Sequence, residues 1–412
     1  MKFTDNAKRA IKIGIICFLS YLAVYLARNV LSTVTPQMQS QGFSKEAIGA
    51  ASSVYFVTYA VGQLINGAIG DKIKPKYMMS LGLALAGVSN FLFSYFNTIS
   101  LNIDGEMAFG AYVAYGCTGF FLAMIYGPMT KVVAENTDMP YTTRCSLGYS
   151  FASYFGSPVA GMLATFLAWQ SVFAVSSIIL VLMAIAVFVS FVVFERKGII
   201  TYGRFKKESE AKNGGVKQLF KRQIVKFSFV SMLTGIVRTS VLFWLPTYFN
   251  ERLGYAENKA TLIFTVASLF ISFGAFIVVF IYEKIGHDLD KTVLLMFSSA
   301  TVFFALTFFV KNALFNVILV VLSIMSSNGA ATMLWSRYCP SLRDTGIVSG
   351  VTGFLDFLSY MAAAASNALF PFLIEQKAWS WESIVLIWLA LMIVGVVISL
   401  PRSIFTRRFD KN

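Results

Sequence analysis

The sequence predicts an all-α membrane protein with twelve transmembrane helices in two pseudo-symmetric six-helix halves. The first observation is the composition: 57% of the 412 residues are hydrophobic and only 13% are charged, whereas soluble proteins carry about 25% charged residues. The second is that apolar runs of helical length recur along the whole chain. The third is one long polar segment near the middle, which separates six runs from six.

Each of the twelve apolar runs is close to or above the ~20 residues that a helix needs to cross a bilayer. The predicted spans are residues 11–35, 46–70, 77–97, 106–133, 143–167, 171–194, 224–249, 260–282, 292–311, 313–336, 346–373 and 381–401. We therefore expect an N-terminal six-helix half (1–194), a basic cytoplasmic linker (195–222) and a C-terminal six-helix half (223–412).

The distribution of basic residues predicts the orientation in the membrane. An even number of spans places both termini on one side, and most Lys and Arg residues fall in the loops of that side. Only Lys45, Arg252, Lys259, Lys311 and Lys377 fall in the loops of the other side. Because basic loops stay in the cytoplasm, we expect a multi-pass plasma-membrane protein with both termini cytoplasmic. The same bias explains the net charge of +14 without a nucleic-acid partner.

Catalytic and metal-binding patterns are absent from the sequence. The four cysteines, Cys17, Cys117, Cys145 and Cys339, are scattered and have no metal-ligand spacing. The one histidine, His287, falls in a charged loop, and the sequence contains no Walker A motif. We therefore expect no enzyme activity, no cofactor and no metal site.

Two arginines lie inside apolar spans, Arg28 in the first and Arg238 in the seventh. An arginine at the centre of a membrane helix costs about 2.5–3.5 kcal/mol on the insertion scale, so it is rare and usually functional. Pro36 and Pro246 each follow their arginine by eight residues, and the two arginines are 210 residues apart. A buried cation repeated once per half predicts an anion site where two related halves meet. The alternative is that one or both side chains reach a membrane surface.

Further polar side chains lie on the helical faces of the first two spans. Tyr21, Tyr25 and Arg28 have the i, i+4, i+7 spacing of a single face. We therefore expect both tyrosines to face the substrate, the alternative being ordinary helix packing. Gln63 shares a face with Tyr59, and both are candidate substrate-binding residues. The amide of Gln63 has the alternative role of bonding one helix to another.

Asp356 is an acidic residue well inside the eleventh span, and Tyr360 follows it by one helical turn. Intramembrane carboxylates usually mark a substrate, ion or proton path, so both residues are candidates for the substrate site. The alternative for Asp356 is a charge pair with Arg337 or Arg238 that holds the C-terminal half together.

Six plus six helices with a basic central loop is similar to the architecture of the major facilitator superfamily. The segment after the second span also resembles the loop signature of that superfamily, and its Asp-Lys-x-x-Pro-Lys form resembles the organophosphate:phosphate antiporter family. We expect Asp71, Lys72 and Lys76 in this segment to pair across the two halves and latch one conformation.

Residues in both halves strengthen the resemblance to the antiporter family. The Tyr/Tyr/Arg face of the first span is similar to that family's first helix, and so is the proline eight residues after its arginine. In the seventh span, Arg238, Trp244, Pro246 and Tyr248 resemble the family's Arg-x5-Trp-x-Pro-x-Tyr pattern. The Gly127-Pro128 pair and residues 346–360 also resemble the family. The resemblance implies that Arg28 and Arg238 bind the substrate phosphate and that Trp244 belongs to the site.

The chain departs from the glycerol-3-phosphate members of that family at three places. Asn29 follows the first arginine where those members have Lys, and Gln63 replaces a second-helix Lys. The fifth span has aromatic and small residues, 150–154, near the position of a family His. The site keeps two fixed cations and loses three other groups, so the departures bear on the substrate more than on the preference for anions.

Together these features predict a secondary transporter of a small organic anion. We expect a phosphorylated metabolite to be exchanged for inorganic phosphate by alternating access, in a monomeric protein embedded in the lipid bilayer. One alternative is a proton-coupled symporter of an organic acid, with Asp356 as the proton carrier. The other is a membrane sensor of sugar phosphate that kept the transporter fold.

Overall fold

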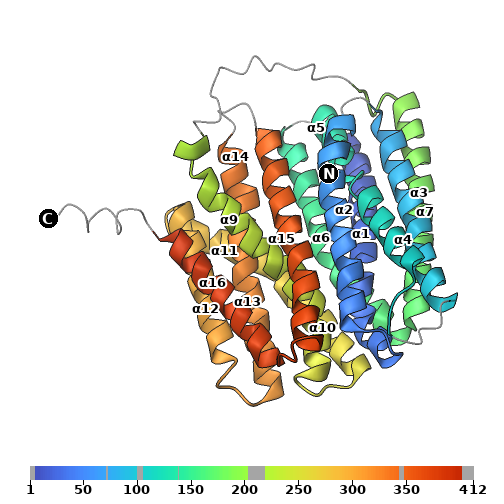
Figure 1. The fold of residues 1–412 in the computed structure, drawn as a ribbon. Coiled ribbons are helices and arrows are strands. Elements are labelled where there is room, and N and C mark those ends of the chain that lie inside the picture. Colours follow the sequence, from blue (N-terminus) through green and yellow to red (C-terminus); the bar gives the residue numbers. More distant parts are fainter. Residues whose placement is uncertain are drawn as a thin grey trace. The chain divides into compact units, whose positions relative to one another are not determined.

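The protein is helical throughout the part that the structure, a computed structural model, describes: residues 5–70, 73–99, 105–137, 139–202, 219–342 and 348–400 (Figure 1). Within those ranges, eleven segments are long and apolar enough to cross a membrane, and each coincides with a predicted span. The remaining predicted span, 143–167, is a helix of 28 residues. That helix is rich in Ser, Thr, Tyr and Gly, which makes it less apolar than the others. The predicted all-helical membrane fold is confirmed.

The N-terminal half contains seven described helices because its fourth span is broken. They are α1 (Asp5–Ser40), α2 (Lys45–Gly70), α3 (Pro75–Ile99), α4 (Phe109–Leu122), α5 (Tyr126–Asn136), α6 (Met139–Phe166) and α7 (Trp169–Arg196). The break lies at residues 123–125, just before the Gly127-Pro128 pair. Pro128 lacks a backbone N–H, so it fits the first turn of α5, where an N–H would have no partner inside the helix.

The C-terminal half contains two spans that include a π-helical turn. Its described elements are α9 (Ile224–Gly235), η1 (Ile236–Val241), α10 (Leu242–Glu251), α11 (Glu257–Lys284), α12 (Leu289–Leu306), α13 (Ala313–Met333), η2 (Leu334–Tyr338), α14 (Cys339–Ser341), α15 (Val348–Glu375) and α16 (Trp381–Ser399). The seventh span runs through α9, η1 and α10, and the tenth through α13 and η2. π-helical turns often occur at functional sites, and η1 contains Arg238.

The chain forms two compact units, Met1–Glu208 with Gly254–Leu269, and Ser209–Leu253 with Phe270–Asn412. The beginning of α11 therefore groups with the first unit, although it follows the seventh span in the sequence. Ser40 donates a hydrogen bond to Glu257 over 3.2 Å, and Gly161 lies directly against the side chain of Thr265. The boundaries 1–194, 195–222 and 223–412 remain predictions.

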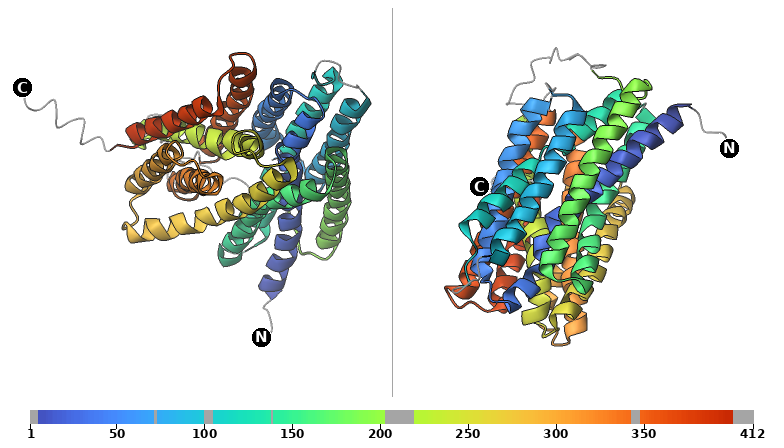
Figure 2. Two further views of the ribbon diagram at one scale, coloured as in Figure 1. Left: turned by 90° about the horizontal axis from the view of Figure 1, so that it is seen from below. Right: turned by 90° about the vertical axis from the view of Figure 1, so that its right-hand side faces the viewer.

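Within each half, neighbouring helices pack through small residues and buried amides. In the N-terminal half, α1 lies beside α6 and α7, and α3 lies beside α4 and α7 (Figures 1 and 2). A Cβ atom on Gly87 of α3 would lie 2.8 Å from Val181 of α7. The buried side-chain amide of Asn90 donates to the hydroxyls of Ser176 and Ser177 over 2.8 and 3.0 Å. Such close contacts hold membrane helices together where the hydrophobic effect cannot.

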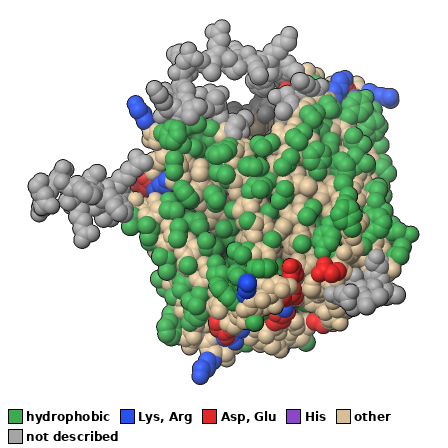
Figure 3. All heavy atoms as spheres, viewed as in Figure 1, with side chains coloured by type: hydrophobic (Ala, Val, Ile, Leu, Met, Phe, Trp, Pro, Cys, Tyr) green, Lys and Arg blue, Asp and Glu red, His purple; other side chains and the backbone are tan. Residues whose placement is uncertain are grey.

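The surface has the pattern of a protein surrounded by lipid. Large apolar side chains are exposed on the outer faces of helices, for example Ile185 on α7 at 56% and Phe280 on α11 at 59%. Figure 3 shows hydrophobic side chains across one whole face, with charged side chains near its ends. Contiguous exposed apolar surface of this extent is typical of membrane proteins rather than soluble ones. The chain is a multi-pass membrane protein.

Candidate functional site

Arg28 lies in the middle of α1 with only 8% of its surface exposed. Its guanidinium carbon lies 5.2 Å from the ring centres of Tyr25 and Phe56 and 5.4 Å from that of Tyr59. Cation–π contacts of this kind contribute about 0.5–2 kcal/mol each, the larger values applying when water is excluded. The rings are neutral, so they hold the guanidinium in place without cancelling its charge.

A cluster of tyrosines adjoins Arg28 on α1. The ring of Tyr21 lies 5.0 Å from that of Tyr25, 5.6 Å from that of Tyr126 and 6.1 Å from that of Tyr149. Tyr126 and Tyr149 are 6.2 Å apart, which completes the cluster. Tyr126 begins α5 directly after the break in the fourth span and is 41% exposed. The predicted Tyr21–Tyr25–Arg28 face therefore exists, and it packs on two further tyrosines from other helices.

Tyr126 and Tyr149 were missed by the sequence reasoning. Tyr149 lies in the fifth span, directly before the aromatic and small residues 150–154. Tyr126 immediately precedes the Gly127-Pro128 pair. The proline in the fourth span was a signal that could have located Tyr126, because a helix that restarts inside a span presents its first side chains away from a regular helical face.

Two amides on α2 have different environments. Asn66 is buried, and its side-chain nitrogen donates to the carbonyl oxygen of Phe120 on α4 over 3.3 Å. Gln63 is half-buried and lies next to Gly62, whose Cα faces Phe120 of α4 and Ala123, the residue that follows this helix. The amide that bonds helix to helix here is therefore Asn66. Tyr59, one turn before Gln63, is buried against Arg28.

Asn29, which stands where some family members have a lysine, has a local role. Its side-chain nitrogen donates to the carbonyl oxygen of Tyr25 over 2.6 Å, one turn back in the same helix. This bond directs the amide along α1.

Arg238 lies in the π-helical turn η1 and is half-buried. Its guanidinium donates to the hydroxyl of Tyr360 on α15 over 3.4 Å. The helix carrying Arg238 approaches α15 closely, because a Cβ atom on Gly235 would lie 2.5 Å from the carbonyl oxygen of Ser359. The hydroxyl of Ser231 also donates to the carbonyl of Leu355 over 2.6 Å. The predicted residues Arg238 and Tyr360 are thus direct neighbours.

Asp356 lies one turn before Tyr360 on α15 and is half-buried. Arg337, one of its two possible partners considered above, is exposed and stacks over the ring of Tyr282 at 5.1 Å. Asp356 and Tyr360, the residue whose hydroxyl accepts from Arg238, lie on the same helix, α15.

Trp244 and Tyr248 lie in α10, after the π-helical turn. Trp244 is 1% exposed, and within the described part of the chain its indole N–H has no hydrogen-bond acceptor. Tyr248 is also buried, and its hydroxyl donates to Asn316 of α13 over 2.7 Å. Tyr248 is therefore tied into the core of the C-terminal half, whereas Trp244 retains an unused donor.

The structure places Lys76, one of the predicted latch residues, in a pair within its own half. Lys76 forms an ion pair with Glu195 at the end of α7, and Lys74 contacts the same carboxylate at 3.3 Å. This arrangement joins the beginning of α3 to the end of α7. The other two latch residues, Asp71 and Lys72, lie outside the described residues. Within the described ranges, no group of three or more His, Cys, Asp or Glu side chains is placed to hold a metal ion.

The sequence model of the Major Facilitator Superfamily matches residues 17–365, which is most of the chain. This chain belongs to the Major Facilitator Superfamily. The fold agrees: a crystal structure of a D-xylose-proton symporter aligns with a TM-score of 0.71 at 14% identity, covering 94% of this chain and 96% of that one. At that level of identity the likeness concerns the fold alone.

Relatives within the superfamily resemble the chain over most of its length. A glycerol-3-phosphate transporter of Bacillus subtilis (strain 168) is 22% identical over 402 residues, covering 90% of this chain and 87% of that protein. A phosphoglycerate transporter protein of Salmonella typhimurium (strain LT2) is 23% identical over 399 residues, covering 88% and 82%. The resemblance to organophosphate transporters drawn from the sequence motifs is therefore confirmed by whole-chain similarity.

Proposed function

We propose that this superfamily member is a secondary transporter that exchanges a small phosphorylated metabolite for inorganic phosphate. The observation that carries the proposal is Arg28, a guanidinium that is 8% exposed in mid-helix and surrounded by aromatic rings. A buried cation of this kind is costly in a membrane protein and usually serves a substrate or ion path. The named relatives are transporters of phosphate esters, which agrees with an anionic substrate.

The aromatic surroundings of Arg28 suit binding and release of an anion. Arginine offers a planar fork of donors that matches phosphate oxygens two at a time. The surrounding rings of Tyr25, Phe56 and Tyr59 carry no charge that would compete with an anion for the guanidinium. The hydroxyls of Tyr21, Tyr126 and Tyr149 supply further donors and acceptors for the body of the substrate without adding charge.

Arg238 is the second phosphate-binding residue of the proposal. Its guanidinium donates to the neutral hydroxyl of Tyr360 over 3.4 Å, a long bond that phosphate oxygens can replace. We propose that one phosphate group is bound by both arginines and that its binding permits the halves to rock in alternating access. Gln63, Trp244 and Asp356 are the further members of the proposed site.

We place the protein in the plasma membrane with both termini in the cytoplasm, because the basic loops lie on the side of the termini. We further propose that it acts as a monomer. Proton-coupled symport through Asp356 remains the second candidate, since this carboxylate is half-buried inside a span. Sensing without transport is less favoured, because the relatives that match most of this chain are named as transporters.

The proposal is tested with purified protein in proteoliposomes. Uptake of labelled glycerol 3-phosphate, 3-phosphoglycerate and hexose 6-phosphate would be measured with and without inorganic phosphate inside the vesicles. We expect at least one ester to enter faster when internal phosphate is present. If these esters stabilise the protein thermally but are not taken up into the vesicles, the protein is a sensor. Absence of both stabilisation and uptake would contradict the proposal.

A further inference from the structure

Tyr126 is the exposed member of the tyrosine cluster beside Arg28. It is 41% exposed, whereas its neighbours Tyr21 and Tyr149 are 7% and 6% exposed. We propose that the ring of Tyr126 stacks against the body of the transported ester and selects a cyclic sugar over an open chain. The inference rests on the proposed function, because it takes the phosphate group of the ester to be bound by Arg28.

Two buried neighbours hold the ring of Tyr126 in a fixed orientation. The ring of Tyr149 meets it edge-on, at 86° and 6.2 Å, and the ring of Tyr21 lies 5.6 Å away at 34°. Edge-on and tilted contacts at these distances are favourable for aromatic rings. A tyrosine has only two side-chain torsions, so a ring that its neighbours already hold loses little entropy when it binds a ligand. Tyr126 is therefore a preformed contact surface.

The backbone around Tyr126 is also fixed, and space adjoins it. Tyr126 begins α5, where the backbone N–H of Met129 donates to the carbonyl oxygen of Ile125 over 3.1 Å. The ring of Pro128 fixes its own φ in this first turn. Among the described residues, a Cβ atom added at Gly127 would meet nothing within 4 Å. The helix therefore restarts at a place where a ligand has room beside the tyrosine.

The position of Tyr126 within its span shows that its exposure is not that of an interfacial tyrosine. Interfacial tyrosines lie at the ends of membrane spans, whereas the span that contains Tyr126 runs on to Val133, roughly 10 Å further along a helix. Tyr126 also contacts Tyr21, which shares a helical face with Arg28. Because arginines inside spans do not face the lipid, the exposed ring lies on the side where the substrate binds.

The chemistry of the cluster matches a sugar ring. A pyranose has faces of C–H groups and edges of hydroxyl groups, so an aromatic ring contacts its face by dispersion while tyrosine hydroxyls bond its edges. An open-chain polyol has no rigid face of this kind. The lysines of some family members are replaced by Asn29 and Gln63, which are neutral. The body of the ester is therefore expected to be uncharged and ring-shaped.

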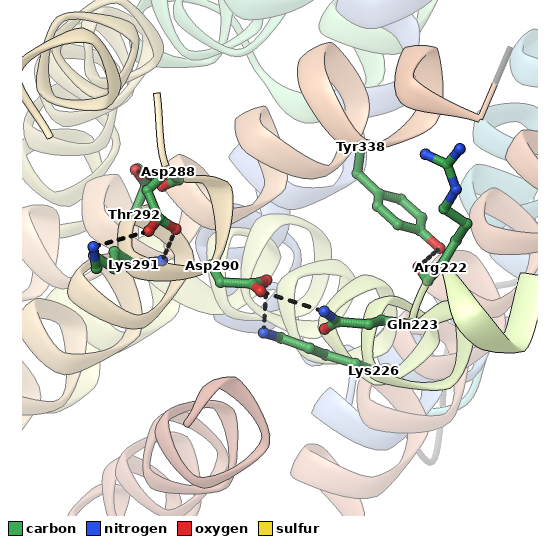
Figure 4. A network of polar contacts seen from close by, with 8 residues as sticks. All are labelled: Arg222, Gln223, Lys226, Asp288, Asp290, Lys291, Thr292 and Tyr338. Atoms are coloured by element: carbon green, nitrogen blue, oxygen red, sulfur yellow. Dashed lines mark hydrogen bonds and ion pairs between the residues drawn. The ribbon is translucent and has the colours of Figure 1, made fainter. Parts of the chain in front are cut away.

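A network at the beginning of α9 shows how a structural cluster of polar side chains differs (Figure 4). Asp290 of α12 contacts the ammonium group of Lys226 of α9 at 2.9 Å, and Asp288 pairs with that of Lys291 at 3.0 Å. A hydrogen bond from the backbone N–H of Lys291 is the main cause that lowers the pKa of Asp288, so this carboxylate stays ionised and paired. These groups bind one another and join two helices, whereas Tyr126 keeps an exposed ring inside a span.

The experiment compares three phosphate esters and three variants of the full-length protein. Glucose 6-phosphate is the ring-shaped ester, glucitol 6-phosphate has the same carbon chain without a ring, and glycerol 3-phosphate has a shorter body. Their affinities for purified protein would be measured by calorimetric titration. Tyr126→Leu removes the aromatic ring, and Tyr126→Phe keeps it. The matched control is Tyr95→Leu, because Tyr95 is 49% exposed on α3 and lies outside the cluster.

We expect the natural protein to bind glucose 6-phosphate about three- to tenfold more tightly than glucitol 6-phosphate, the range that a favourable aromatic contact supplies. Tyr126→Leu should bring this ratio close to one and leave the affinity for glycerol 3-phosphate unchanged within about twofold. Tyr126→Phe and Tyr95→Leu should both keep the ratio of the natural protein.

Three results would overturn the inference. The first is an equal affinity of the natural protein for the two six-carbon esters, and the second is an unchanged ratio in Tyr126→Leu. The third is an equal loss of affinity for all three esters in Tyr126→Leu, since Tyr126 would then only support the fold. If glycerol 3-phosphate binds and no preference for a ring is found, the proposed function stands without this inference. If none of the three esters binds, both fail.

Discussion

Gly156 of α6 lies directly on the backbone of Tyr25 in α1. A Cβ atom added at Gly156 would be 2.5 Å from the carbonyl carbon of Tyr25 and would also overlap its Cβ atom. Tyr25 in turn contacts both Tyr21 and Arg28. The absence of a side chain at position 156 therefore sets how the candidate binding face of α1 meets α6.

Gly156→Ala is expected to weaken substrate binding and lower thermal stability. Its methyl group meets backbone atoms that cannot rotate away, and such overpacking typically costs about 1–3 kcal/mol. Gly148→Ala is the matched control on the same helix, because a Cβ atom there has no neighbour within 4 Å. Melting temperature and phosphate-ester binding would be measured for both. Equal behaviour of the two variants would contradict the importance of this contact.

Both arginines are expected to be indispensable for binding. Lys keeps the positive charge but loses the donor fork, so Arg28→Lys and Arg238→Lys should already lose most binding, and the Ala variants should lose about 2–5 kcal/mol. Arg252→Ala is the control, since this arginine pairs with Glu382 at 2.7 Å and is exposed. Exchange would be measured in proteoliposomes after confirming normal membrane insertion. Near-normal exchange in either Arg28→Ala or Arg238→Ala would refute phosphate binding by that residue.

The substrate is expected to require an anionic head. Two arginines match one phosphate dianion, and the lysines of some family members are replaced here by Asn29 and Gln63. Neutral sugars should not compete with their phosphate esters in a thermal-shift titration. If glucose stabilised the protein as well as glucose 6-phosphate did, recognition would reside in the tyrosine cluster and not in the arginines.

The role of Asp356 separates antiport from proton symport. If phosphate drives exchange, internal phosphate should accelerate uptake, and Asp356→Asn should leave exchange largely intact. If protons drive uptake, an inward proton gradient should cause accumulation without internal phosphate, and Asp356→Asn should abolish that accumulation while sparing exchange. Vesicles with and without internal phosphate would each receive a pH step. Strong pH-driven accumulation in phosphate-free vesicles would exclude obligatory antiport.

The membrane spans could be predicted from the sequence because length and apolar composition determine them directly. Every predicted span is helical where the structure describes it, apart from a few residues at span ends and the break at 123–125 in the fourth. The span 143–167 remains helical although it is rich in Ser, Thr and Gly, because α6 packs along α1. The shared face of Tyr21, Tyr25 and Arg28 was also predictable, since helical spacing alone places the three residues together.

The contacts between helices were not predictable in the same way. Nothing in a helical pattern indicates that Tyr126 and Tyr149 adjoin Tyr21, because these neighbours depend on which helices pack together and where the fourth span breaks. The pairing of Lys76 with Glu195 could not be predicted either. The sequence shows that the segment around Lys76 is basic, but which carboxylate it meets depends on where α7 ends. The π-helical turns also left no clear signal in the sequence.

The π-helical turn at Ile236–Val241 absorbs one residue of the seventh span. A π turn holds about one residue more than an α turn, and each residue of an α-helix advances by roughly 100° around the axis. Deleting one residue from this turn would restore a regular α-helix with little rotation of the segment that follows, so Trp244 and Tyr248 would keep their buried positions. The same deletion within the regular helix α10 would rotate everything after it by about that angle. The fold should therefore tolerate a single-codon deletion in Ile236–Val241 better than one in α10, and the deletion in the π turn should act mainly on the position of Arg238.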